Sequence, residues 1–327
     1  MKNSQNLKNA AYFAVILILV LVFLISGLQI LESTVLLRGQ IEEVVTPSKT
    51  ISRDGKDYFP RQDITVLLIM GIDQVGPVVD SGSYNNEGES DVVMLAVFDE
   101  TAGQYTILAL NRDTMMDIPI LGLGGKQAGT KVGQLALAHT YGSGLQDSCE
   151  NTRKAVSDFL GGIYIDHYVS MNMDAVAILN DAVGGVTVMV TENFADIDPT
   201  IQLGEMTLHG QQALNYVQIR KGVGTQMNVS RMERQRGYMS GFIASLDGQL
   251  NQNNAFLVDL YEQVTPYIVS DCSVNALSAL VSRFSEFEMI DIVSPEGDNQ
   301  KGEQYMEFYV DEEALDKLVL SLFYSEK

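Results

Sequence analysis

Cysteine and histidine are scarce in this sequence of 327 residues. The two cysteines, Cys149 and Cys272, lie far apart and form no Cys-x-x-Cys pattern, which disfavours a disulfide framework and a thiolate zinc site. The three histidines, His139, His167 and His209, provide no short-range pair of metal ligands, so the sequence does not predict a zinc centre. The cysteines are therefore either free or joined in a single bridge.

Basic residues are also few. The chain has 21 Lys and Arg against 42 Asp and Glu, which gives a formal net charge of -21. Proteins that bind nucleic acid non-specifically neutralise phosphates with Lys and Arg, so this balance argues against a nucleic-acid partner. The length and a hydrophobic fraction of 46% allow a large buried core, which argues against a disordered chain.

Charged residues are absent from Asn9 to Leu31, and this apolar run is long enough to cross a bilayer as a helix. A cleaved signal peptide would have a shorter apolar region, and a core helix would need partners on all sides. Lys2 and Lys8 precede the run, which places the N-terminus in the cytoplasm. We therefore expect a cytoplasmic tail (1–11), a transmembrane anchor (12–31) and an extracytoplasmic main domain.

The remaining pattern predicts a helical stalk and linker (32–61), a main domain (62–246) and a C-terminal extension of helices and strands packed on it (247–327). Alternating and continuous apolar runs predict strands, and apolar residues at helical spacing predict helices. The mixture indicates an α/β or α+β fold with a central mixed sheet covered by helices on both faces. Strands are expected at 64–73, 91–99, 105–110, 166–172, 187–190 and in the stretches EMIDIV and YMEFYV, and helices at 131–141, 151–160, 175–183, 210–219, from 231, near 255–268 and 273–285, and from 312.

The first three expected strands carry polar residues at their ends. Asp73 ends the first, Asp91 starts the second, and Arg112 and Asp113 follow the third. If these strands alternate in direction, the residues lie together, beneath a polar, Gly-rich loop between Asp73 and Asp91 that is expected to be exposed. Two carboxylates and an arginine predict a site for a metal ion and an anion. The alternative is that Arg-Asp-Thr simply forms a solvated turn with an Asx-type bond.

The cations are confined to one segment. No Lys or Arg occurs at 155–219 or 237–282, whereas Arg220, Lys221, Arg231, Arg234 and Arg236 lie between these stretches. Arginine favours bidentate contacts to phosphate or carboxylate. The spacing of Ser230 and Glu233 predicts a helix starting at Arg231, where free backbone N–H groups also favour an anion. The alternative is a cationic helix paired with acidic neighbours, which suits Arg236 well and Arg234 in part.

The motifs GID, SDVVMLAVFD, LALNRDT, IDHYVSMNMDAVAILNDAVGGVTVMV, GQQALNYVQIR and SRMERQRGYM together resemble a LytR-CpsA-Psr domain, in order and in spacing. This resemblance implies a phosphotransferase that moves a glycopolymer, such as teichoic acid or capsular polysaccharide, from undecaprenyl pyrophosphate to peptidoglycan. The family usually works with magnesium. The expected partners are therefore the lipid-linked glycopolymer, the peptidoglycan acceptor and the membrane.

The resemblance also implies roles for residues. Asp73 and Asp91 match the metal-associated aspartates, and Arg112 matches a pyrophosphate-binding arginine. Asp113 is expected to orient Arg112 or to take the acceptor's proton. The residues expected to bind the substrate are Arg112, Gln218, Arg220, Asn228, Arg231 and Gln235, of which Arg112, Arg220 and Arg231 are also expected to act in catalysis with Asp113.

Two of these positions depart from the family pattern. Gln218 stands where the family usually has an arginine, and Asn228 where it usually has an aspartate. Losing one charge-assisted contact costs roughly 1.5–3 kcal/mol of binding free energy, and Asn cannot hold a metal ion as a carboxylate does. The resemblance therefore leaves two other readings open, a non-catalytic member that binds polyprenyl-pyrophosphate-linked precursors and a structural partner of an envelope machine. Transcriptional regulation fits poorly, because no DNA-reading element is visible.

Overall fold

The computed structural model describes residues 50–326 with gaps at 54, 123–124, 220–222, 224–233, 235–236, 239, 243, 247, 250–255, 273–275, 277–279, 281–282, 285–286 and 303–304. A six-stranded mixed sheet forms its centre, in the order β11-β8-β3-β4-β5-β12. Its strands are β3 (Ile64–Ile72), β4 (Ser90–Asp99), β5 (Gln104–Leu110), β8 (His167–Asn172), β11 (Ile268–Ser270) and β12 (Glu288–Val293). The pairs β3–β8 and β5–β12 are parallel, and the other three are antiparallel. The predicted mixed central sheet is therefore confirmed.

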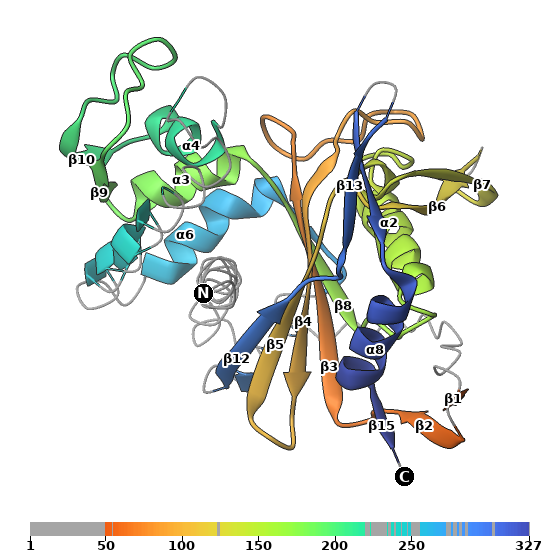
Figure 1. Ribbon diagram of the computed structural model, residues 1–327. Coiled ribbons are helices and arrows are strands. Elements are labelled where there is room, and N and C mark those ends of the chain that lie inside the picture. Colours follow the sequence, from red (N-terminus) through yellow and green to blue (C-terminus); the bar gives the residue numbers. More distant parts are fainter. Residues whose placement is uncertain are drawn as a thin grey trace, which may run out of the picture.

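Both faces of this sheet are buried, as the long apolar runs predicted. Even positions of β3, such as Leu68 and Met70, pack with α2 (Gln146–Phe159) and α8 (Glu312–Phe323). Odd positions, such as Leu67 and Ile69, pack in a second cluster that includes Phe284, which is helical. Figure 1 shows α2 and α8 on one side of the sheet, and α3 (Asp174–Ala182), α4 (Gln211–Gln218) and α6 (Phe256–Val264) grouped beside one end of it.

A separate apolar cluster joins α3, α4 and α6 to the hairpin of β9 (Val186–Val190) and β10 (Gly204–Leu208). The described residues between 234 and 249 are helical and supply Tyr238, Phe242 and Leu246 to this cluster. Helix α3 ends, as predicted, at two glycines, Gly184 and Gly185, with φ of 86° and 93°. The cluster forms a lobe beside one end of the sheet (Figure 1).

Three predictions of local structure were wrong in part. Residues 131–141 do not form a helix. Strand β7 (Gln127–Gln134) pairs there with β6 (Met115–Leu121), and a short 3-10 turn follows it. The helix predicted near 255–268 ends at Val264, where Pro266 lacks an N–H to continue it, and 268–270 is strand β11. Residues 51–60 form β1 (Ile51–Arg53) and β2 (Lys56–Pro60) rather than a helical stalk, because β2 pairs with β15 (Tyr324–Glu326) at the end of the chain.

The C-terminal part contributes to the same core. Residues 268–270 and 288–293 supply two strands of the central sheet, and α8 packs Leu315, Val319 and Phe323 on it. The remaining pair, β13 (Gly297–Lys301) and β14 (Met306–Val310), forms a hairpin.

None of the helices in the described part of the chain is both long and apolar enough to span a membrane. The predicted anchor (12–31) lies outside the described residues.

Candidate functional site

The ends of three neighbouring strands meet at one end of the central sheet. β3 and β4 are antiparallel with Ile72 opposite Ser90, and β4 and β5 are antiparallel with Val93 opposite Leu110. The end of β3, the start of β4 and the end of β5 therefore lie side by side, which confirms the predicted alternation. We call this end of the sheet, with Asp73, Glu89, Asp91, Arg112 and Asp113, the Arg112 rim.

Arg112 is the centre of an ion-pair network at this rim. Its Nη1 contacts Asp91 and its Nη2 donates to Glu89. Its Nε lies 3.7 Å from Oδ1 of Asp113. The Arg112 side chain is 31% exposed, although its Nε atom is buried. One guanidinium thus meets three carboxylates, and a phosphate that binds it must compete with them.

A tight turn presents Arg112. The Asp113 N–H donates to Oδ1 of Asn111 at 3.0 Å, and the Thr114 N–H donates to the Asn111 carbonyl at 3.0 Å. The Arg112 carbonyl accepts from the Ala136 N–H at 3.0 Å. The predicted Asx-type turn is therefore present, with Asn111 as its Asx residue, and it serves to hold the arginine at the rim.

The loop between Asp73 and Asp91 was predicted to be exposed, and most of it is. Asn86 is an exception at 5% exposure. Its Nδ2 donates to the carbonyls of His139 at 2.8 Å and Gly142 at 2.9 Å, and its Oδ1 accepts from the Gly88 N–H at 2.7 Å. These bonds fasten the end of the loop to the body of the protein and so position Glu89 next to Arg112.

Helix α4 reaches the same rim through a chain of contacts. Asp73 is exposed, and the carbonyl of the following Gln74 accepts from the Met173 N–H at 3.2 Å. Nε2 of Gln218, the last residue of α4, lies 3.0 Å from the Met173 sulfur. The end of α4 at Gln218 is therefore close to the end of β3.

Most of the predicted cationic segment lies outside the described residues. This applies to Arg220, Asn228, Arg231 and Gln235, so their meeting with Arg112 stays a prediction. The predicted start of a helix at Arg231 is outside them too.

Arg234 is described and has a structural role. It is 4% exposed, its Nε donates to the Tyr216 carbonyl at 2.9 Å, and its other nitrogens contact the Ile219 carbonyl and Glu192. The guanidinium also lies 5.3 Å from the centre of the Phe194 ring. The interpretation that Arg234 pairs with an acidic neighbour is therefore correct, and the contact fastens the end of α4.

Sequence reasoning missed two residues of the site. Glu89 precedes Asp91 by two positions, so both side chains point to the same face of the extended chain, a signal that was available. Gln134 donates from Nε2 to Oδ1 of Asp113 at 2.9 Å and to the Met306 carbonyl at 2.7 Å. Gln134 could not have been found from the sequence, because its segment was predicted to be helical.

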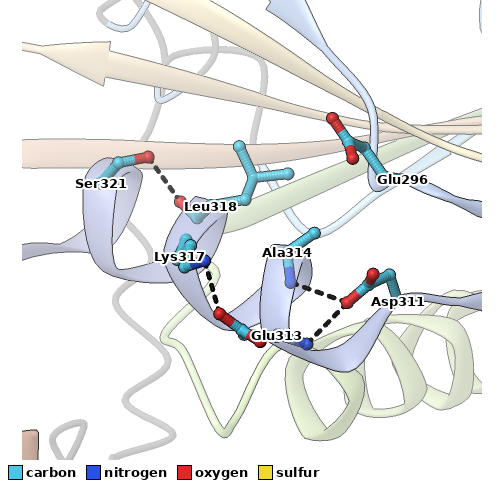
Figure 2. A pocket seen from close by; sticks show the side chains of 7 residues that line it. All are labelled: Glu296, Asp311, Glu313, Ala314, Lys317, Leu318 and Ser321. Atoms are coloured by element: carbon cyan, nitrogen blue, oxygen red, sulfur yellow. Dashed lines mark hydrogen bonds and ion pairs between the residues drawn. The ribbon is translucent and has the colours of Figure 1, made fainter.

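A hollow of about 530 Å³ lies beside α8. Figure 2 shows the carboxylates of Glu296, Asp311 and Glu313 around it. Asp311 accepts from the first N–H groups of α8, and Lys317 pairs with Glu313 at 2.6 Å. The hollow thus has three acids and one paired amine, the same balance as Arg112 with its three carboxylates, but its cation is an amine and not a guanidinium that can bind a phosphate through two N–H donors.

Comparison with known proteins identifies the family. The family model described as the LytR_cpsA_psr family matches residues 37–322. A relative from Enterococcus faecalis, the polyisoprenyl-teichoic acid--peptidoglycan teichoic acid transferase TagU, is 30% identical over 236 residues, which are 72% of this chain and 69% of the relative. The cell wall biosynthesis protein LcpA of Corynebacterium glutamicum is 26% identical over 87% of this chain and 60% of its own length. Three other TagU relatives are matched over 57% to 64% of their lengths.

Solved structures share the fold. TagV of B. subtilis superposes with a TM-score of 0.55 at 23% identity, covering 80% of this chain and 96% of TagV. A structure of TagT bound to LI-WTA superposes with a TM-score of 0.56 at 20% identity, covering 86% of this chain and 98% of TagT. The match of the family model to most of the chain, together with the shared fold, shows that this chain belongs to the LytR_cpsA_psr family.

Proposed function

We propose that this chain transfers a glycopolymer, such as teichoic acid or capsular polysaccharide, from polyprenyl pyrophosphate to peptidoglycan. The observation that carries the proposal is the Arg112 rim, where a partly exposed guanidinium lies at the converging ends of three strands with the end of α4 close by. Relatives whose names state this activity on teichoic acid support the choice of substrate class.

Phosphoryl transfer requires positive charge placed around the phosphate more than it requires covalent chemistry by the protein. Arg112 supplies a planar group that binds phosphate through two N–H donors. Asp113 is a positioning residue, because its carboxylate lies behind Nε of Arg112 and is itself held by Gln134. Arg220 and Arg231, predicted from the sequence, would add the remaining positive charge.

The charge at the rim favours a cation as co-factor. Arg112 contributes +1, and its partners Glu89, Asp91 and Asp113 contribute -3, which leaves a formal charge of -2, and Asp73 adds a further carboxylate where a diphosphate should bind. Oxygen donors of this kind suit magnesium. Asp73, Glu89 and Asp91 would hold it, although their oxygens do not all lie within 4.8 Å of one another in this structure. Bound there, magnesium would offset the charge of the diphosphate. Arg112 could then exchange a carboxylate partner for a phosphate oxygen.

The test is glycopolymer transfer, or release of phosphate from a polyprenyl diphosphate, by purified full-length protein. We expect Arg112→Ala to lower the rate by about a hundredfold or more, which is the usual cost of removing a group that stabilises charge in the transition state. The matched control is Arg283→Ala, because Arg283 pairs with Glu100 at the opposite end of β4. An unchanged rate in Arg112→Ala, or an equal loss in both variants, would contradict the proposal.

A second candidate function, binding of the lipid-linked precursor without turnover, is favoured by Gln218. Its amide contacts a methionine sulfur and brings no positive charge to the end of α4. Under this alternative, wild-type protein retains polyprenyl diphosphate without converting it, and the double substitution Gln218→Arg with Asn228→Asp creates turnover. Turnover by the wild-type chain would exclude it.

A further inference from the structure

Three potential metal ligands meet at the end of the sheet opposite the Arg112 rim. His167 is the first residue of β8, and Asp271 and Cys272 directly follow β11, which runs antiparallel to β8. One donor atom from each side chain, an imidazole nitrogen, a carboxylate oxygen and a thiol sulfur, lies within 4.8 Å of the other two. In the described part of the chain, Asp73 and Asp91 form no group this close.

The backbone around the three side chains is held in place. The Tyr168 N–H donates to Oδ1 of Asp271 at 3.0 Å, and Ser270 Oγ donates to the Tyr168 carbonyl at 2.7 Å. The Cys272 N–H donates to Ser270 Oγ at 3.1 Å. Because these bonds link the start of β8 to the turn after β11, the ligand positions are organised before any ion binds.

We propose that His167, Asp271 and Cys272 bind a zinc ion. Nitrogen, oxygen and sulfur ligands together suit zinc, whereas magnesium and calcium prefer oxygen alone. Three protein ligands leave a fourth tetrahedral position for water, which can reach the site because the His167 side chain is 33% exposed. Nδ1 of His167 lies 3.6 Å from Oδ1 of Asp271, so a small movement of side chains would bring both into coordination distance.

The zinc site is separate from the Arg112 rim. The opposite end of β8, at Asn172, donates from Nδ2 to the Gly76 carbonyl in the loop after Asp73. The five steps from His167 to Asn172 rise about 3.3 Å each, so β8 separates the two sites by about 16 Å. An ion there would link the turn after β11 to the first residue of β8 in the central sheet.

Cobalt titration of the chelator-treated full-length protein, under a thiol-free reductant, tests the proposal. We expect a near-ultraviolet thiolate-to-cobalt charge-transfer band that zinc abolishes by competition. His167→Ala and Asp271→Asn should weaken cobalt binding by about tenfold or more, since even loss of an outer-shell partner costs that much. Cys272→Ser should lose the band, and added zinc should raise the Tm of the wild type and not of this variant.

The matched control is Cys149→Ser. Cys149 is completely buried and donates from Sγ to Ser170 at 3.3 Å, and burial raises its pKa to about 12, so its thiol gives no thiolate for a metal. This variant should keep the cobalt band. Absence of the band in wild-type protein, its persistence in Cys272→Ser, or equal cobalt affinity in His167→Ala would overturn the proposal. Glycopolymer transfer is a separate readout, so the zinc site can fail while the proposed function holds.

Discussion

His139 lies directly behind the loop that carries Glu89. Its ring is 1% exposed, and Nδ1–H donates to the Gly88 carbonyl at 2.9 Å. Nε2 is buried without a hydrogen-bond partner in the described part of the chain. Burial lowers the pKa of this histidine to about 4, so it is neutral at pH 7. A charge on the ring would be placed in an apolar interior next to the Arg112 rim.

We therefore predict that His139 makes the folded protein less stable as the pH falls. Between pH 6.5 and about 4, the unfolded chain protonates His139 and the folded chain does not. The contribution of neutral His139 to the free energy of unfolding is thus complete above pH 6.5 and falls with pH, by at most about 1.4 kcal/mol per pH unit. Urea unfolding at several pH values measures this dependence. The free energy of unfolding of His139→Asn should fall less steeply with decreasing pH than that of the wild type, and the new side chain keeps a donor for the Gly88 carbonyl. His209→Asn, at a histidine whose side chain is 62% exposed, should match the wild type. Equal slopes in all three proteins would contradict the prediction.

The two cysteines also differ at this scale. Cys149 packs among the core residues on one face of the central sheet, whereas Cys272 packs against the cluster on the other face. Both are free, which settles the alternative between free thiols and a single bridge. Their different exposure explains why we assign metal binding to Cys272 and leave Cys149 as a core residue.

Among the elements, α4 depends on one arginine for its end. Its last carbonyls have no partner inside the helix, and Arg234 donates to those of Tyr216 and Ile219 while it pairs with Glu192. The pair is nearly buried, with side-chain exposures of 3% and 15%. This arrangement holds Ile219 in place, directly before Arg220 in the chain.

Arg234→Met should lower the free energy of unfolding by roughly 3–5 kcal/mol, because it leaves the Glu192 carboxylate buried and unpaired. Adding Glu192→Gln to this variant should restore part of the loss, since the unpaired charge is then gone. The matched control is Arg283→Met, which breaks an ion pair whose arginine is 57% exposed and should cost at most about 1 kcal/mol. Chemical unfolding measures the free energy of unfolding of all three variants. A loss in Arg234→Met no larger than in the control would show that the buried pair is unimportant.

At the scale of the whole molecule, the fold separates the Arg112 rim, at one end of the central sheet, from the proposed zinc site at the other. The lobe of α3, α4 and α6 lies beside the sheet (Figure 1). A net charge of -21 disfavours contact with nucleic acid and with anionic lipid surfaces, so attachment to a membrane would depend on the apolar run near the N-terminus.

We propose that residues 12–31 anchor the chain in the cell membrane, with the N-terminus in the cytoplasm and the main domain outside. The full chain should then sediment with membranes, resist extraction by high salt or carbonate, and be digested by protease added to intact protoplasts. A chain that begins at residue 32 should be released, because about 20 apolar residues are needed to span the bilayer. Recovery of the full chain in the soluble fraction would contradict the anchor.

Several features followed from the sequence alone. Continuous apolar runs predicted the central strands, and alternation of β3, β4 and β5 predicted that Asp73, Asp91 and Arg112 lie at one end of the sheet. These predictions succeeded because local periodicity and strand direction are enough to determine them. The motifs likewise led to the family, since residues in fixed order and spacing carry that information.

Other features were decided only by tertiary structure. The pairing of β6 with β7 overrode a helical pattern, and Pro266 with the pairing of β11 to β8 ended a predicted helix early. Glu89 became a partner of Arg112 because buried Asn86 fixes the loop, and Gln134 joined the site through its strand. His167 and Cys272 meet because β8 and β11 are neighbours in the sheet. Contacts between residues far apart in the chain depend on how strands pair and pack, which local patterns do not encode.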